Sequence, residues 1–157
     1  MEFSKVIAAR HSVRVFKDTP VDREMVEAIL DQAATAPSSK NSRSSAFVVI
    51  DDKDTLQALS EMRSYGSALL KGAACAVVVL GDTAKTDLWV ENAAISATYI
   101  QLCATNLGLG SCWVHVNGRL RDQKDPSKGT AEDYVRELLG LKDAFKPLCI
   151  VALGYEG

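Results

Sequence analysis

One long apolar stretch, residues 87–107, limits most strongly how this chain can fold. It predicts a helix with apolar side chains over much of its circumference instead of along one stripe. Such a helix lies either at the centre of a domain or at an interface between subunits. At 1.5 Å per residue the helix would be about 30 Å long, the width of a small domain. Because a chain of 157 residues cannot easily cover it on all sides, the pattern favours a dimer.

The same stretch is a poor membrane span, because polar residues such as Glu91 and Gln101 interrupt it. The N-terminal residues lack the basic and apolar regions of a signal peptide. The four cysteines form no C-x-x-C pair and have no neighbouring histidines, so zinc and iron–sulfur spacings are absent. A formal net charge of −2 gives no reason to expect a nucleic-acid partner. Taken together, these features lead us to expect a reduced, cytoplasmic protein with no metal and no membrane partner.

The remaining pattern alternates short helices and strands, which predicts a single α+β domain over residues 1–157. We expect a central mixed sheet of four to five strands, flanked by helices. Expected helices lie at residues 2–9, 20–36, 54–62, 87–107 and 130–140, and expected strands at 46–51, 74–80, 111–117 and 148–153. A charged loop over residues 119–129 is expected to be exposed and mobile.

A basic segment, residues 9–16, holds two arginines, a histidine and a hydroxyl. If it is extended, Arg10, Ser12 and Arg14 share one side, with the two arginines rooted roughly 13 Å apart. That spacing suits an elongated ligand with a phosphate at one end and a polar heterocycle at the other. The residues expected to face the other way are His11, Val13 and Val15.

A simpler interpretation of the basic segment is a half-buried strand whose charges are solvated. Residues 9–16 alone do not separate the two interpretations. The serine-rich stretch at residues 38–45 has the same ambiguity, because such loops are usually solvated connections.

Four short segments occur in a fixed order along the chain: RHSVRVF at 10–16, APSSKN at 36–41, GLGSCW at 108–113 and IVALGY at 150–155. Together they resemble the R-[RH]-S-x-R-x-[FY], A-P-S-x-x-N, G-L-G-[ST]-C-W and G-Y-P motifs of the FMN-dependent nitroreductase family. The resemblance covers nearly the whole chain. It implies the fold of that family, with the long apolar helix at the interface of a homodimer.

The resemblance also implies which residues bind FMN. Arg10 and Ser12, in the segment that includes His11, would hold the phosphate and ribityl groups, and Arg14 would lie near N1 and O2 of the flavin. A fixed cation there favours the negative charge that two-electron reduction leaves near N1. The loop of the other subunit would lie against the same flavin through Pro37, Ser38, Ser39 and Asn41.

A third part of the implied site follows the G-L-G turn. There, one main-chain N–H would point at flavin N5. The residues expected to line the isoalloxazine ring are His115, Val116, Asn117 and Gly118.

The chain departs from the family pattern in two places. The serine loop lacks the family's Q-P-W, and Glu156 stands where the family has the proline of G-Y-P, without the basic K-x-R pair that follows it in many members. Phosphate binding would then depend on Arg10, with help from Arg14, Arg119 or Arg121.

We therefore expect an oxidoreductase that passes hydride from NAD(P)H through FMN to a nitroaromatic, quinone or similar acceptor. No side chain is assigned a catalytic role, because the cofactor does the chemistry. The alternative is a flavin-binding module with little turnover, used for storage or sensing. A Rossmann-type nucleotide domain does not fit, because the chain has no G-x-G-x-x-G after its first strand.

Overall fold

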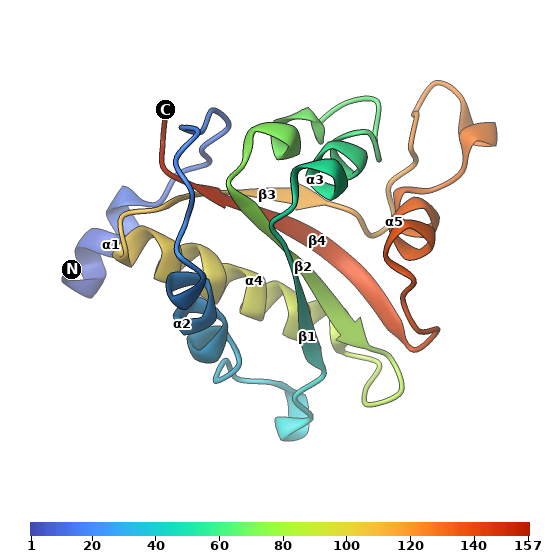
Figure 1. Cartoon of the computed structure of the whole chain (residues 1–157). Helices are drawn as coiled ribbons and strands as arrows, with labels where there is room; N and C mark the ends of the chain where they lie inside the picture. Colours follow the sequence, from blue (N-terminus) through green and yellow to red (C-terminus); the bar gives the residue numbers. More distant parts are fainter.

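A computed structural model describes all residues, 1–157, and shows a four-stranded sheet with helices on both faces (Figure 1). The strand order across the sheet is β1-β2-β4-β3. The strands are β1 (Ser45–Ile50), β2 (Cys75–Asp82), β3 (Gly110–His115) and β4 (Phe145–Gly154). The helices are α1 (Phe3–Ala9), α2 (Arg23–Ala33), α3 (Lys53–Ser60), α4 (Trp89–Asn106) and α5 (Ala131–Leu139), with short 3-10 turns η1 (Ser39–Asn41), η2 (Ala68–Gly72) and η3 (Pro126–Lys128).

The α+β class and the four strands confirm the prediction, but the sheet is not mixed. All three ladders, β1–β2, β2–β4 and β3–β4, are antiparallel. The one parallel contact is an isolated bridge between Ser12 and Ser111. A connection long enough to contain a helix can return the chain to either end of a sheet, so helices between strands do not dictate parallel pairing.

The strand β4 begins at Phe145, three residues before the predicted start at 148. That prediction was wrong because Pro147 lies inside the strand instead of before it. The ladder with β2 skips a residue here: Val79 pairs with Cys149 and Leu80 with Pro147. A bulge at this position lets a central strand contain a proline, which has no N–H to donate.

The helix ends confirm the local signals in the sequence. Thr130 caps α5 by accepting a hydrogen bond from the Asp133 N–H at 3.1 Å. Gly140 ends the same helix in the left-handed conformation, and Gly108 follows α4 with a φ of 82°. These positions are encoded by residues close in sequence, which is why composition and spacing identify them.

Two apolar cores lie on opposite faces of the sheet. The turn η2 and the helices α3 and α5 cover one face, and α2 and α4 cover the other. Ala93, Ala97 and Ala104 of α4 are fully buried against the sheet, and these small side chains let the helix lie close to it. Ile100 is fully buried on the same side, whereas Ile95 on the outer side is 37% exposed. Thus α4 belongs to this subunit's core along one face only.

No helix combines the length and apolar character needed to cross a membrane. No group of three or more His, Cys, Asp or Glu side chains is placed to hold a metal ion. All four cysteines are free thiols. Burial raises the pKa of Cys75 to about 11, so this thiol stays protonated and packs as a small apolar side chain.

Candidate functional site

The basic segment is fastened to the sheet by its main chain. The Val13 N–H donates to the Ser111 carbonyl of β3 at 2.9 Å. Farther along, the Lys17 N–H donates to the Tyr155 carbonyl at 2.8 Å, and Gly157 N–H donates to the Val15 carbonyl at 2.9 Å. The segment therefore lies between the start of β3 and the residues that follow β4, two parts of the chain that are distant in sequence.

Two glycines allow this close approach. A Cβ atom at Gly110 would lie 2.8 Å from Cγ2 of Val13, and one at Gly154 would lie 2.8 Å from Cδ1 of Phe16. Such separations are shorter than van der Waals contact, so a larger residue at either place would displace the segment. Val13 and Phe16 thus fix the segment to the sheet through positions where the sheet has no side chain.

The two arginines of the basic segment form no ion pairs, since none of the five in the chain involves Arg10 or Arg14. The Arg14 charge acts on the thiol of Cys112, where it opposes the rise in pKa that burial causes. Ser12 is exposed between the two arginines. Ser12 and Arg14 are thus exposed and Arg10 is half-exposed, and neither arginine is held in an ion pair.

The alternation predicted for the opposite side holds only in part. Val13 is buried as expected, but Val15 is 71% exposed. Instead Phe16 packs against the core. The segment changes partner from β3 to the C-terminal residues 155–157, so it does not keep the side-chain alternation of one continuous strand.

His11 contacts the chain through both ring nitrogens. Its Nδ1 lies 2.9 Å from the Ala9 carbonyl, and its Nε2 lies 3.1 Å from Oε1 of Glu156. Both partners accept only, so both contacts require the protonated ring. The Ala9 carbonyl and then Glu156 raise the pKa of His11 above its usual value of 6.5. His11 thereby links the basic segment to the residues after β4.

The other end of β3 presents the second histidine. The Trp113 Nε1–H donates to His115 Nδ1 at 3.1 Å, and the two rings are stacked at 6.1 Å between centroids. Because an indole N–H only donates, this contact fixes His115 in the neutral tautomer with its proton on Nε2. Burial, and then the charges of Arg119 and Arg63, lower the pKa of His115.

Most backbone N–H groups directly after His115 already form hydrogen bonds with the sheet. The N–H groups of Val116 and Asn117 both donate to the Leu148 carbonyl, at 3.1 and 3.0 Å. The Val116 side chain is fully buried in the core. Gly118, with a φ of 73°, forms the turn after them and donates to no backbone carbonyl. Of these N–H groups, that of Gly118 is the one free to meet a ligand.

Three further arginines, Arg63, Arg119 and Arg121, differ in how many contacts their side chains make within the chain. Arg63, which the sequence interpretation missed, donates from Nη1 to the His115 carbonyl at 3.4 Å. Arg119 is exposed and makes no ion pair. Arg121 is occupied: it donates to the carbonyls of Met62 and Glu61 and lies 4.1 Å from the centroid of the Tyr134 ring.

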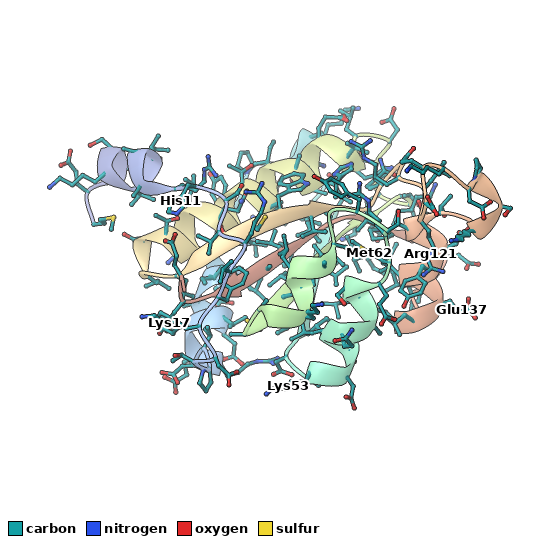
Figure 2. The ribbon with its side chains drawn as sticks, turned by 90° about the horizontal axis from the view of Figure 1, so that it is seen from above. His11, Lys17, Lys53, Met62, Arg121 and Glu137 are labelled. Carbon is teal, nitrogen blue, oxygen red and sulfur yellow. The ribbon has the colours of Figure 1, made fainter.

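The contacts of Arg121 correct one expectation. Figure 2 shows this side chain beside Met62, far along the molecule from His11, so it is not placed to assist Arg10. The loop at 119–129 is exposed or half-exposed throughout, as expected, and a bridge between Leu120 and Thr130 joins its two ends.

The serine loop, residues 38–44, uses many of its polar groups internally. Ser38 Oγ accepts from the Arg43 N–H at 3.0 Å. The Ser39 N–H donates to Oδ1 of Asn92 on α4, also at 3.0 Å. Pro37 and Asn41 stay exposed. The loop therefore presents Pro37 and Asn41 to the surroundings while Ser38 and Ser39 hold its shape.

The serine loop and the basic segment lie at opposite ends of the sheet (Figure 1). The loop enters the sheet at Ser45, which is level with Gly81 of β2 and so with Lys146 of β4. The basic segment meets the sheet at Ser111, which pairs with Leu153 of β4. At about 3.3 Å per residue, these two levels are roughly 23 Å apart along β4. One copy of the chain does not bring the two predicted halves of the site together.

An apolar groove of about 470 Å³ opens between α1, α2 and α4. Tyr99 and Leu102 line it from the outer side of α4, and Phe3 lines it from α1. Several large apolar side chains near these helices are exposed. They are Met1, Phe3, Ile7, Ile95 and Leu107.

Comparisons with known proteins give one consistent answer. The family model described as Nitroreductase family matches residues 7–64 and 57–155. A solved FMN-dependent nitroreductase from Clostridium difficile is 41% identical with a TM-score of 0.90, over 96% of this chain and 86% of that chain. A protein of Archaeoglobus fulgidus named "Putative NADH dehydrogenase/NAD(P)H nitroreductase" is 34% identical over 158 residues, 98% of this chain and 85% of its own. A solved protein of Bacteroides thetaiotaomicron with the same name is 28% identical with a TM-score of 0.89, over 100% of this chain and 88% of that chain.

Proposed function

This chain belongs to the nitroreductase family of oxidoreductases, and from that premise we propose that it is an FMN-dependent enzyme whose two cofactor sites are shared across a homodimer. One observation carries the proposal: a segment anchored to the sheet by its main chain carries Arg10, Ser12 and Arg14, and neither arginine has an ion-pair partner. The similar Clostridium difficile protein is named as FMN-dependent.

The donors of this segment fit FMN by their chemistry. A guanidinium offers a planar fork of N–H donors that matches a phosphate and keeps its charge at any physiological pH. Ser12, between the two arginines, adds a hydroxyl that can donate or accept. Neither arginine forms an ion pair within the chain, so both charges could serve an anionic ligand.

When bound, FMN would accept a hydride from NAD(P)H and pass two electrons to a nitroaromatic, a quinone or a similar acceptor. Within this chain, Arg10 and Ser12 would bind the phosphate and ribityl groups. Arg14 would place its charge at the pyrimidine edge, and the Gly118 N–H is the free backbone donor near the ring. His115, held neutral by Trp113, would act as a hydrogen-bond donor and not as a proton carrier.

The proposed dimer would complete each site. The serine loop lies too far from the basic segment of its own chain, so Pro37, Ser38, Ser39 and Asn41 would serve the cofactor of the partner. The uncovered apolar groove beside α4 supports a second copy as its occupant, because a surface of this kind is energetically costly in water. A two-fold axis would then create two equal sites.

The test is flavin loading followed by anaerobic reduction. We expect the purified protein to bind FMN with one site per chain and to absorb at about 450 nm, as bound flavin does. NADH or NADPH should bleach this absorbance without oxygen, and a panel of nitroaromatics and quinones should then restore it.

Each step has an outcome that contradicts a part of the proposal. A protein that ignores added FMN would refute the cofactor. A protein that binds FMN but is not bleached by either nicotinamide would be a flavin-binding module and not an NAD(P)H-dependent enzyme.

A further inference from the structure

The serine loop has an unusual backbone. Lys40, Asn41 and Arg43 all have positive φ values, of 50°, 53° and 47°. Residues other than glycine rarely adopt this left-handed conformation, because the Cβ atom approaches the neighbouring carbonyl oxygen. Three such residues within four positions persist only if contacts with the rest of the protein favour them. Side chains outside the loop must therefore supply such contacts.

One buried side chain supplies four hydrogen bonds to the loop. Asn92, in the first turn of α4, is only 3% exposed. Its Oδ1 accepts from the Ser39 N–H, and its Nδ2 lies 3.2 Å from Ser39 Oγ, 3.2 Å from Ser42 Oγ and 2.9 Å from Ser44 Oγ. The two N–H groups of one amide are shared among three hydroxyls of the loop. A single residue thus contacts the loop before, inside and after its left-handed stretch.

The other side-chain links between the loop and the body are weaker. Ser39 Oγ lies 3.4 Å from Thr86 Oγ1, and Arg43 donates from Nη1 to the Ala34 carbonyl, also at 3.4 Å. Lys85 Nζ donates to the Arg43 carbonyl at 3.3 Å on the exposed side. Water competes for the exposed links, whereas the amide of Asn92 is shielded from water.

The place of Asn92 in the fold is also fixed. A Cβ atom at Gly81 of β2 would lie 2.5 Å from Cε3 of Trp89, so the start of α4 lies directly on the sheet. Asn92 follows Trp89 by one helical turn, and the next turn places Ser96 against Ser45 of β1, Oγ to Oγ at 3.0 Å. The same helix carries the exposed Ile95 on its outer face.

We propose that Asn92 is a positioning residue for the cofactor site: from α4 it holds residues 38–44 in the conformation, partly left-handed, that presents Pro37 and Asn41 to the flavin of the partner subunit. The proposal rests on the proposed function, because that function gives the loop a ligand. It goes further by assigning the loop's shape to one amide on the helix that the two subunits would share.

The first experiment measures FMN affinity and loop protection in Asn92→Ala. We expect the dissociation constant for FMN to rise by tenfold or more and amide hydrogen exchange of residues 38–44 to speed up by a similar factor. Asn92→Asp should recover part of both, since a carboxylate of the same shape accepts from the Ser39 N–H and from hydroxyls that can rotate to donate.

The matched control is Ser96→Ala, one turn farther along α4. This side chain is equally buried at 4% exposed, but it bonds to β1 and not to the loop. Its thermal stability should fall, while FMN affinity stays within about twofold of wild type and loop exchange is unchanged. If Asn92→Ala does not fold, Ser44→Ala removes the shortest of the three hydroxyl contacts and should loosen the loop in the same direction.

The outcomes separate this proposal from the proposed function. If the wild-type protein does not bind FMN, the function is refuted, and faster loop exchange in Asn92→Ala still shows whether the amide holds the loop. Wild-type exchange in Asn92→Ala would overturn the positioning role. An equal loss of FMN affinity in Ser96→Ala would also overturn it, because the effect would then be general to α4.

Discussion

The basic segment and the serine loop are fastened to the protein in contrasting ways. Residues 10–16 are held by main-chain hydrogen bonds and by Val13 and Phe16, so the side chains of Arg10 and Arg14 stay free. Residues 38–44 are held largely by Asn92, which accepts from the Ser39 N–H and bonds to the hydroxyls of Ser39, Ser42 and Ser44. A segment anchored by its backbone can present side chains to a ligand. A loop anchored by its side chains presents its backbone shape and the few residues that stay exposed.

The largest expected effect comes from separating the two regions. Ile95→Asp puts a charge on the outer face of α4, where a partner would bury it, and such burial costs several kcal/mol. We expect monomers in sedimentation velocity and a loss of FMN affinity of more than tenfold. Leu138→Asp on α5 is the matched control, at 39% exposed against 37% for Ile95, and should leave both unchanged. A dimeric Ile95→Asp protein would argue against this interface.

The next largest effect is a loss of stability at Gly154, against which Phe16 of the basic segment packs. Gly154→Ala introduces a Cβ atom 2.8 Å from Phe16 and 3.3 Å from the backbone nitrogen of Ala74, which cannot move freely. Overpacking of this kind costs about 1–3 kcal/mol, measurable by urea denaturation. Gly72→Ala, where no atom lies within 4 Å, should cost far less. Equal stability of the two variants would contradict the close approach that we describe.

The free arginines should matter for the ligand and not for the fold. Arg10→Ala removes a charge-assisted hydrogen bond, which is worth about 1.5–3 kcal/mol of FMN affinity. Its free energy of unfolding without ligand should change by less than about 0.5 kcal/mol, because the side chain has no ion-pair partner. Fluorescence titration with FMN measures the first quantity, and an unchanged dissociation constant would refute the phosphate role of Arg10.

The smallest effect is a difference between the two histidines. In an NMR titration His11 should show a pKa above 6.5, because of the Ala9 carbonyl and Glu156, and His115 should show one below it. The His11 contacts are therefore fully present below pH 6.5 and disappear as the pH rises through the raised pKa. For His115, burial favours the neutral ring, so its environment destabilises the fold as the pH falls below 6.5. Glu156→Gln should lower the pKa of His11 and leave that of His115 unchanged.

The sequence predicted those features that neighbouring residues encode. The caps at Thr130 and Gly140 and the turn at Gly108 needed only local spacing. The start of β4 was missed because a bulge opposite β2 accommodates Pro147, and β2 is distant in sequence. The outward Val15 was missed for a similar reason, since the partner of the segment changes at that point.

In the predicted site, too, local features could be predicted and features that depend on distant residues could not. Alternation predicted the exposure of Ser12 and Arg14 and the burial of Val13 between them, whereas the state of Arg121 depends on Met62 and Tyr134 and could not be derived. Asn92 did leave a signal, as a polar residue in an apolar helix, but its three serine partners are visible only in the folded chain. The FMN site itself stays a prediction.

The distance between the two ends of the sheet has a genetic consequence. If every flavin draws its arginines from one polypeptide and its loop from the other, a chain lacking Arg10 and a chain lacking Asn92 fail for different reasons. Mixed in one solution, they would form hybrid pairs in which one pocket inherits both defects and the other inherits none. Two alleles that each bind flavin weakly would then complement each other, because one of the two pockets in every hybrid would bind flavin normally.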